Sequence, residues 1–140
     1  MMMKVFNVQQ RYVLNFYRLC FWLILLFVSQ QSLVPQPAQV FENSWDKALH
    51  FTAWFGVSVA AYLAYGYHSR GLKVILAVFA YAVLVECGQL WVPGRFFSLL
   101  DMLANGLGCL LAVLAIVLLE RWVPLPWQQR LSGLQRRKPW

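Results

Sequence analysis

Three short polar motifs border or interrupt apolar stretches of this chain. Within each motif, a spacing of three or four residues places an acidic residue on the same helix face as a histidine or an amide. Carboxylates beside an imidazole suit acid–base chemistry, whereas cationic and amide side chains suit binding of a phosphate or carboxylate. The candidate acids and bases are Asp46, His50, Glu86 and Asp101, and the candidate substrate-binding residues are Lys47, Gln89, Arg95, Ser98 and Asn105.

Glu86 is the hardest of these residues to explain, because it lies within an apolar run near a predicted helix C-terminus. A carboxylate there opposes the helix dipole, and burying it without a partner is costly. An ion pair with Arg95 or Lys47 that only joins helices is one interpretation. We favour a carboxylate that lines a polar cavity, because ionisable residues within membrane spans are mostly functional.

The third motif combines a helix start with a buried amide. Ser98 and Asp101 have the spacing of a capping box, which would satisfy free amide groups at the start of a helix. This capping role does not exclude a second one for Asp101. Asn105 lies about two turns further along, so its amide needs a partner on a neighbouring helix or a ligand.

A metal site is the alternative to an anion site. Asp46, His50, Glu86 and Asp101 are all suitable ligand types, but they show no dense metal motif such as HExxH. Lys47 and Arg95 would also oppose a cation. An anionic group fits better, because it could lie beside these cations and two helix N-termini. We therefore expect no metal and no other cofactor.

Four apolar segments must position these motifs, at about residues 19–34, 48–66, 72–92 and 99–119. Hydrophobic residues make up 61% of the 140 residues and charged residues 12%, which is too apolar for a soluble domain. Each segment is close to the roughly 20 residues that a helix needs to cross a bilayer. The sequence predicts a single-domain, all-α membrane protein folded as an antiparallel bundle of four transmembrane helices.

The first segment has two interpretations, because the polar residues 29–32 leave only a short apolar stretch before them. A secretory signal peptide would explain Arg11 and Arg18 as its basic region, but no AxA cleavage site follows. We favour a retained helix whose polar outer end faces protein.

The basic residues predict the orientation. Ten of the twelve Lys and Arg lie in the two termini and in the loop near residues 70–73, leaving Lys47 and Arg95 for the other two loops. Positively charged loops stay in the cytoplasm, so both termini are expected there and the three motifs at the outer ends of the helices. The sequence has no stripe of basic residues on a polar helix face, so a nucleic-acid partner is not expected. Cys20, Cys87 and Cys109 are expected to be packing residues.

The three motifs together resemble the VanZ-like family of bacterial membrane proteins. The segment from Asp46 to Phe51 is similar to that family's DKxxHF signature, Glu86 to Arg95 to its ExxQ and PxR segment, and Ser98 to Gly108 to its SxxDxxxNxxG segment. The resemblance covers about residues 33–119, and the three motifs occur in the family's order. Residues 120–140 would form a basic cytoplasmic tail.

This resemblance implies a protein of the bacterial inner membrane connected with the cell envelope, and it implies glycopeptide tolerance for the founding member. Our first hypothesis is a site for an anionic membrane lipid or a lipid-linked cell-wall precursor, with or without catalysis. The alternatives are a non-catalytic scaffold or binding protein and, last, a small proton-coupled transporter, whose site usually lies nearer the bilayer midplane. A homodimer is compatible with four short helices, although no residue requires one.

Overall fold

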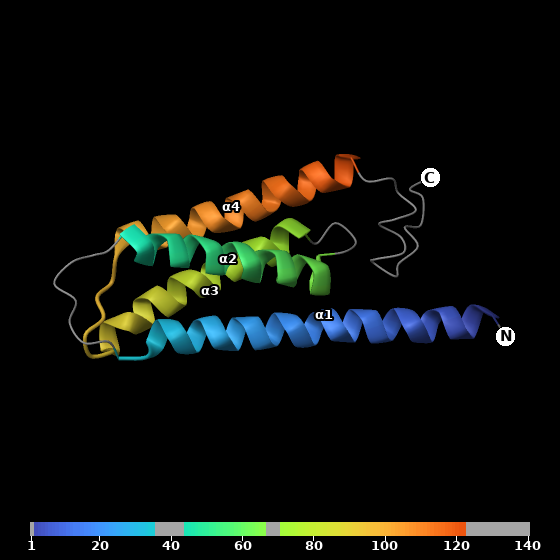
Figure 1. Cartoon of the computed structure of the whole chain (residues 1–140), viewed down its shortest axis with the longest axis horizontal. Helices are drawn as coiled ribbons and strands as arrows, with labels where there is room; N and C mark the ends of the chain where they lie inside the picture. Colours follow the sequence, from blue (N-terminus) through green and yellow to red (C-terminus); the bar gives the residue numbers. More distant parts are fainter. Residues whose placement is uncertain (1, 36–43, 67–70, 123–140) are drawn as a thin grey trace.

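Four long helices make up the described part of the chain. The computed structural model describes residues 2–35, 44–66 and 71–122. Its helices are α1 (Met2–Leu33), α2 (Ser44–Tyr65), α3 (Gly71–Gly88) and α4 (Leu99–Trp122), and a short 3-10 turn, η1 (Gln89–Trp91), continues α3. The helices alternate in direction along the bundle (Figure 1), and the three described ranges contain no strand. The predicted all-helical bundle is confirmed.

Four helical stretches, the third of which is α3 together with η1, are long and apolar enough to span a membrane: Arg11–Leu33, Asp46–Tyr65, Gly71–Trp91 and Leu99–Trp122. Large apolar side chains also cover the outside of the bundle; Leu84 of α3 is 67% exposed and Leu103 of α4 is 57% exposed. An apolar surface this extensive is unfavourable in water and suits lipid. The chain is therefore a multi-pass membrane protein, and the cytoplasmic location of its termini stays a prediction.

Small residues bring α2 and α4 close together. Gly108 of α4 lies directly against α2, where an added Cβ atom would clash with the carbonyl oxygen of Phe51 and lie 3.0 Å from the backbone nitrogen of Phe55. Close approach of backbones at small residues is typical of membrane helices. Gly56 does not have this role, although its spacing from Ala60 suggests one, because an added Cβ there would meet nothing within 4 Å.

The polar stretch 29–32 of α1 faces protein only in part, because Ser29 is buried and Ser32 half-buried, whereas the two glutamines between them are exposed. The Ser29 hydroxyl donates to the carbonyl oxygen of Leu25 at 2.7 Å and lies 3.0 Å from the hydroxyl of Tyr81 on α3. These contacts explain how a polar stretch can occur in a helix that crosses lipid. Whether this helix is retained or cleaved as a signal peptide stays a prediction.

The opposite end of the bundle is held by aromatic residues. The indole nitrogen of Trp22 donates to the hydroxyl of Tyr65 at 3.0 Å, and the guanidinium of Arg18 lies 5.4 Å from the Tyr65 ring centre. On the far side, the Tyr62 hydroxyl donates to the carboxylate of Glu120. The three cysteines are free thiols, of which Cys109 is buried and Cys20 and Cys87 are half-buried. Beyond residue 122, the basic tail lies outside the described residues.

Candidate functional site

The three polar motifs meet at one end of the bundle. Because the helices alternate in direction, the N-termini of α2 and α4 lie at the same end as the C-terminus of α3 (Figure 1). We call this the polar end and define it by Asp46, Lys47, His50, Glu86, Ser98, Asp101 and Asn105. Several of these side chains are almost fully buried: Glu86 and Asn105 are each 1% exposed and Asp101 is 7% exposed. Topology thus gathers polar groups from three helices in a protein-enclosed region.

Ser98 caps the start of α4 and joins it to α3. Its hydroxyl oxygen accepts a hydrogen bond from the backbone N–H of Asp101 at 3.3 Å, which confirms the predicted N-cap. In a capping box, the third residue of the helix would accept the N–H of the capping residue. Here Oε1 of Glu86 accepts the Ser98 N–H, at 3.0 Å. Glu86 therefore has the acceptor role toward the Ser98 N–H that the capping-box pattern assigns to Asp101.

His50 of α2 is held by Asn105 of α4. Nδ1 of the imidazole lies 3.1 Å from Oδ1 of Asn105. An amide oxygen can only accept, so Nδ1 must carry the proton and donate it. In the neutral imidazole, Nε2 is then left with its lone pair. The partner that the buried Asn105 amide requires is thus a neighbouring helix, and the contact fixes one histidine tautomer.

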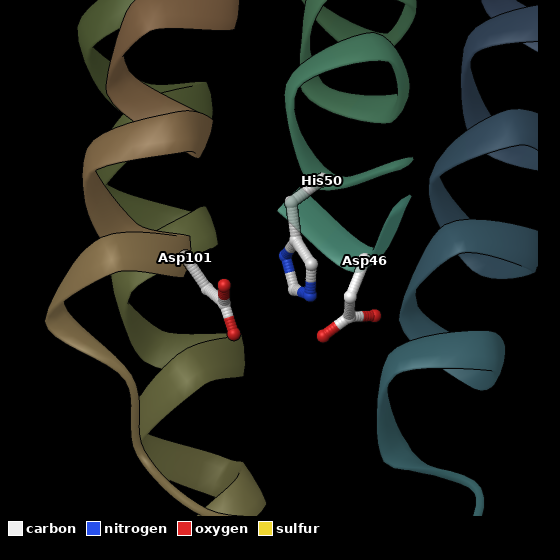
Figure 2. A group of neighbouring side chains, drawn as sticks. All are labelled: Asp46, His50 and Asp101. Carbon is white, nitrogen blue, oxygen red and sulfur yellow. The ribbon is translucent and has the colours of Figure 1, made fainter. Parts of the chain in front are cut away.

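Two carboxylates flank this histidine. Figure 2 shows Asp46 and His50 extending from α2 and Asp101 from α4, with their polar ends turned toward one another. One ligand atom from each lies within 4.8 Å of those of the other two. Two ionised carboxylates at 4.8 Å repel each other by roughly 3.5 kcal/mol at an effective dielectric constant near 20. Such an arrangement requires a proton, an ammonium group or another cation nearby.

Lys47 is the cation that the structure places beside this cluster. Its Nζ lies 3.9 Å from Oδ1 of Asp101, which is close enough for an ion pair but too long for a hydrogen bond. Within the described ranges, Oδ1 of Asp101 and Oε2 of Glu86 are buried oxygens with no hydrogen-bond partner. Buried polar atoms normally have such a partner. A bound molecule or ion would therefore gain the most binding free energy by contacting these two oxygens.

Gln89 and Arg95 turn toward α1. The side-chain amide of Gln89 donates to the carbonyl oxygen of Ser32 at 3.0 Å. The guanidinium of Arg95 donates to the carbonyl oxygens of Gln31 at 2.8 Å and Val34 at 3.4 Å. These are the free carbonyls at the C-terminus of a helix, where a cation is also favoured by the dipole. In the part of the chain that the structure describes, Arg95 forms no ion pair with Glu86.

The three sequence motifs do not reveal that the end of α1 contacts Gln89 and Arg95. The last turn of α1 offers main-chain carbonyls to these two side chains, and main-chain groups carry no residue signature. The available signal is the polar stretch 29–32 at the end of an apolar helix. Such a stretch indicates protein contact without identifying the partner.

Chemically, the polar end combines a histidine with a defined tautomer, three carboxylates, one ammonium group and the N-termini of two helices. It can accept a proton at Nε2 of His50, bind hydroxyl groups through its carboxylates, or hold a cation.

Comparison with known proteins gives one finding: a family model described as VanZ/LLP1 matches residues 2–120. The searches of curated proteins and of solved structures gave no significant match.

Proposed function

Because the chain belongs to the VanZ/LLP1 family, we propose that it is a protein of the bacterial inner membrane that binds the phosphate-bearing headgroup of an envelope lipid. The lipid would be an anionic membrane lipid or a lipid-linked cell-wall intermediate. Through this binding the protein would influence tolerance to glycopeptides. The polar end is the proposed binding site.

One observation carries this proposal: buried ionisable and amide side chains from α2, α3 and α4 converge at one end of a membrane-spanning bundle. Burial of unpaired carboxylate oxygens costs folding free energy, so a purely structural protein gains nothing from them. At the membrane interface, lipid headgroups are the most abundant polar ligands other than water. The site would therefore lower the stability of the protein without ligand and raise its affinity for the headgroup.

The groups of the polar end have complementary uses toward such a headgroup. Lys47 and the positive N-terminal ends of α2 and α4 would attract the phosphate. The carboxylates of Asp46 and Asp101 would accept hydrogen bonds from sugar or glycerol hydroxyls. Nε2 of His50 could take a proton from one of these hydroxyls, with Asn105 holding the ring in place.

The distribution of basic residues supports an outward-facing site. Positively charged termini and the 70–73 loop favour the cytoplasm. The N-termini of α2 and α4 would then lie at the periplasmic face, where cell-wall intermediates are used. A site opening to the cytoplasm would argue for a different substrate.

The proposal is tested by removing single groups and measuring envelope function in a bacterial strain lacking its own copy. The variants are His50→Ala and Glu86→Gln, with Thr52→Val as the matched control because Thr52 lies on α2 but is exposed. We expect both site variants to lose their effect on lipid-linked precursor pools and on glycopeptide tolerance. Membrane levels of each variant must equal those of the wild type, and Thr52→Val should behave as the wild type.

A second candidate function is that of a non-catalytic scaffold, which specific contacts favour. Glu86 links α3 to the start of α4, Gln89 links η1 to α1, and Arg95 links the loop before α4 to α1, each through a hydrogen bond to the main chain. If this is their whole purpose, Glu86→Gln will lower stability in detergent before it alters any envelope phenotype. A well-folded Glu86→Gln protein that has lost its effect on precursor pools would exclude the scaffold.

A further inference from the structure

The cluster of Asp46, His50 and Asp101 has the composition and the geometry of a metal site. We propose that these three side chains bind a divalent transition-metal cation, of which Mn²⁺ and Zn²⁺ suit the donors best. Two carboxylate oxygens and one imidazole nitrogen are ligands that both ions accept. This inference depends on the three side chains alone and does not require that the proposed lipid function be correct. With an ion bound, Nε2 of His50 would no longer act as a base, and a headgroup would be contacted by the ion.

The distances allow the three donors to share one ion. Their ligand atoms all lie within 4.8 Å of one another. Donors about 2.1 Å from a tetrahedral ion lie roughly 3.4 Å apart, so side-chain shifts of about 1 Å would complete the site. The donors come from the first two turns of α2 and the first turn of α4, and these helices are packed closely at Gly108. Their backbone positions are therefore fixed before any ion binds.

The contact between His50 and Asn105 is a second, independent observation. Metal-binding histidines usually donate their other ring N–H to an oxygen acceptor, which orients the ring and fixes the tautomer. Oδ1 of Asn105, 3.1 Å from Nδ1 of His50, is such an acceptor. It leaves Nε2 as the metal-binding nitrogen. The ring lies with the Asp46 and Asp101 side chains turned toward it (Figure 2).

Asp101 also has a buried oxygen, Oδ1, that accepts no hydrogen bond from the described residues, although it lies within ion-pair distance of Lys47. Asp101 is only 7% exposed, yet its Oδ1 has no hydrogen-bond partner within the described ranges. Figure 2 shows this carboxylate directed toward the other two donors. A dication would satisfy the oxygen and offset the repulsion between the two carboxylates.

The charge argument against a metal is weaker in the structure than in the sequence. That argument rests on Lys47 and Arg95, and Arg95 binds carbonyl oxygens at the end of α1. Lys47 remains, with Nζ 3.9 Å from Oδ1 of Asp101, so an ion bound to this oxygen would have to displace the ammonium group. On Zn²⁺, three protein ligands would leave one position of a tetrahedral shell open, as in catalytic zinc sites; on the six-coordinate Mn²⁺ they would leave three. A phosphate oxygen is a suitable fourth ligand.

The test uses the full-length protein, purified in a neutral detergent and stripped of metal by a chelator. Mn²⁺ binding is measured by electron paramagnetic resonance, and Zn²⁺ binding by competition with a chromophoric chelator. We expect one site per chain. The Asp101→Asn and His50→Ala variants should bind Mn²⁺ at least tenfold more weakly, whereas Glu120→Gln, which removes a carboxylate from the opposite end of α4, should bind as the wild type.

A further variant keeps the test informative if the others fold poorly. Asp46→Cys replaces a carboxylate near the start of α2 by a thiolate, which should favour Zn²⁺ over Mn²⁺ relative to the wild type. The inference is overturned if the wild type binds neither ion, if Asp101→Asn and Glu120→Gln bind alike, or if Asp46→Cys leaves the preference unchanged. Because no lipid headgroup is added, these outcomes are separate from those of the envelope experiment.

Discussion

Replacing Gly108 by alanine is expected to push α2 and α4 apart and so to loosen the polar end. The new Cβ atom would clash with the carbonyl oxygen of Phe51 and lie 3.0 Å from the backbone nitrogen of Phe55. Both obstacles are main-chain atoms, so no side-chain rotation can relieve the overlap. One turn earlier in α4, Asn105 makes the contact with His50, which would lengthen as the helices separate.

The expected magnitude follows from two opposing terms. Alanine is favoured over glycine within a helix by about 1 kcal/mol. Overpacking a well-packed interior costs about 1–3 kcal/mol, and contact with main-chain atoms of α2, which cannot rotate away, favours the upper end of that range. The Gly108→Ala variant should therefore lose about 2 kcal/mol of unfolding free energy.

Gly56→Ala is the matched control, because its Cβ would meet nothing within 4 Å. It carries the same helix-propensity gain without the clash, so it should gain about 1 kcal/mol. The propensity term cancels in the comparison, and the two variants should differ by about 3 kcal/mol. Unfolding by SDS titration in mixed micelles, followed by far-UV circular dichroism, measures this difference. Equal stability of the two variants would refute the close packing inferred at Gly108.

Two further changes test the helix ends at the polar end of the bundle. Ser98→Ala removes the hydroxyl that accepts the Asp101 N–H and should cost about 1 kcal/mol of unfolding free energy, measured by the same titration. The Ser98→Thr variant keeps a hydroxyl and should retain most of this stability. Equal losses of stability in the two variants would argue against capping. Arg95→Ala removes the donor to the Gln31 and Val34 carbonyls and should cost about 1 kcal/mol, with faster hydrogen exchange confined to the last turn of α1; unchanged exchange there would contradict the contact.

The sequence alone determined the four helices and the end of the bundle at which the polar motifs meet. Long apolar runs in a chain this poor in charge can only be membrane helices, because lipid offers no partner for unpaired backbone groups. Short connections then force antiparallel neighbours. From these two facts, Asp46, Glu86 and Asp101 had to lie at one end, and the family motifs pointed to the same residues.

The tertiary structure decided which of these residues contact one another. Arg95 could have paired with Glu86, yet it binds the end of α1, and Glu86 instead receives the N–H of Ser98. Gly56 and Gly108 each have an alanine four residues away, at Ala60 and Ala104, but of these two glycines only Gly108 lies against another backbone. Local spacing specifies the face of a helix on which a side chain lies. The rotation and separation of neighbouring helices decide what that face meets, and they depend on packing summed over residues far apart in the chain.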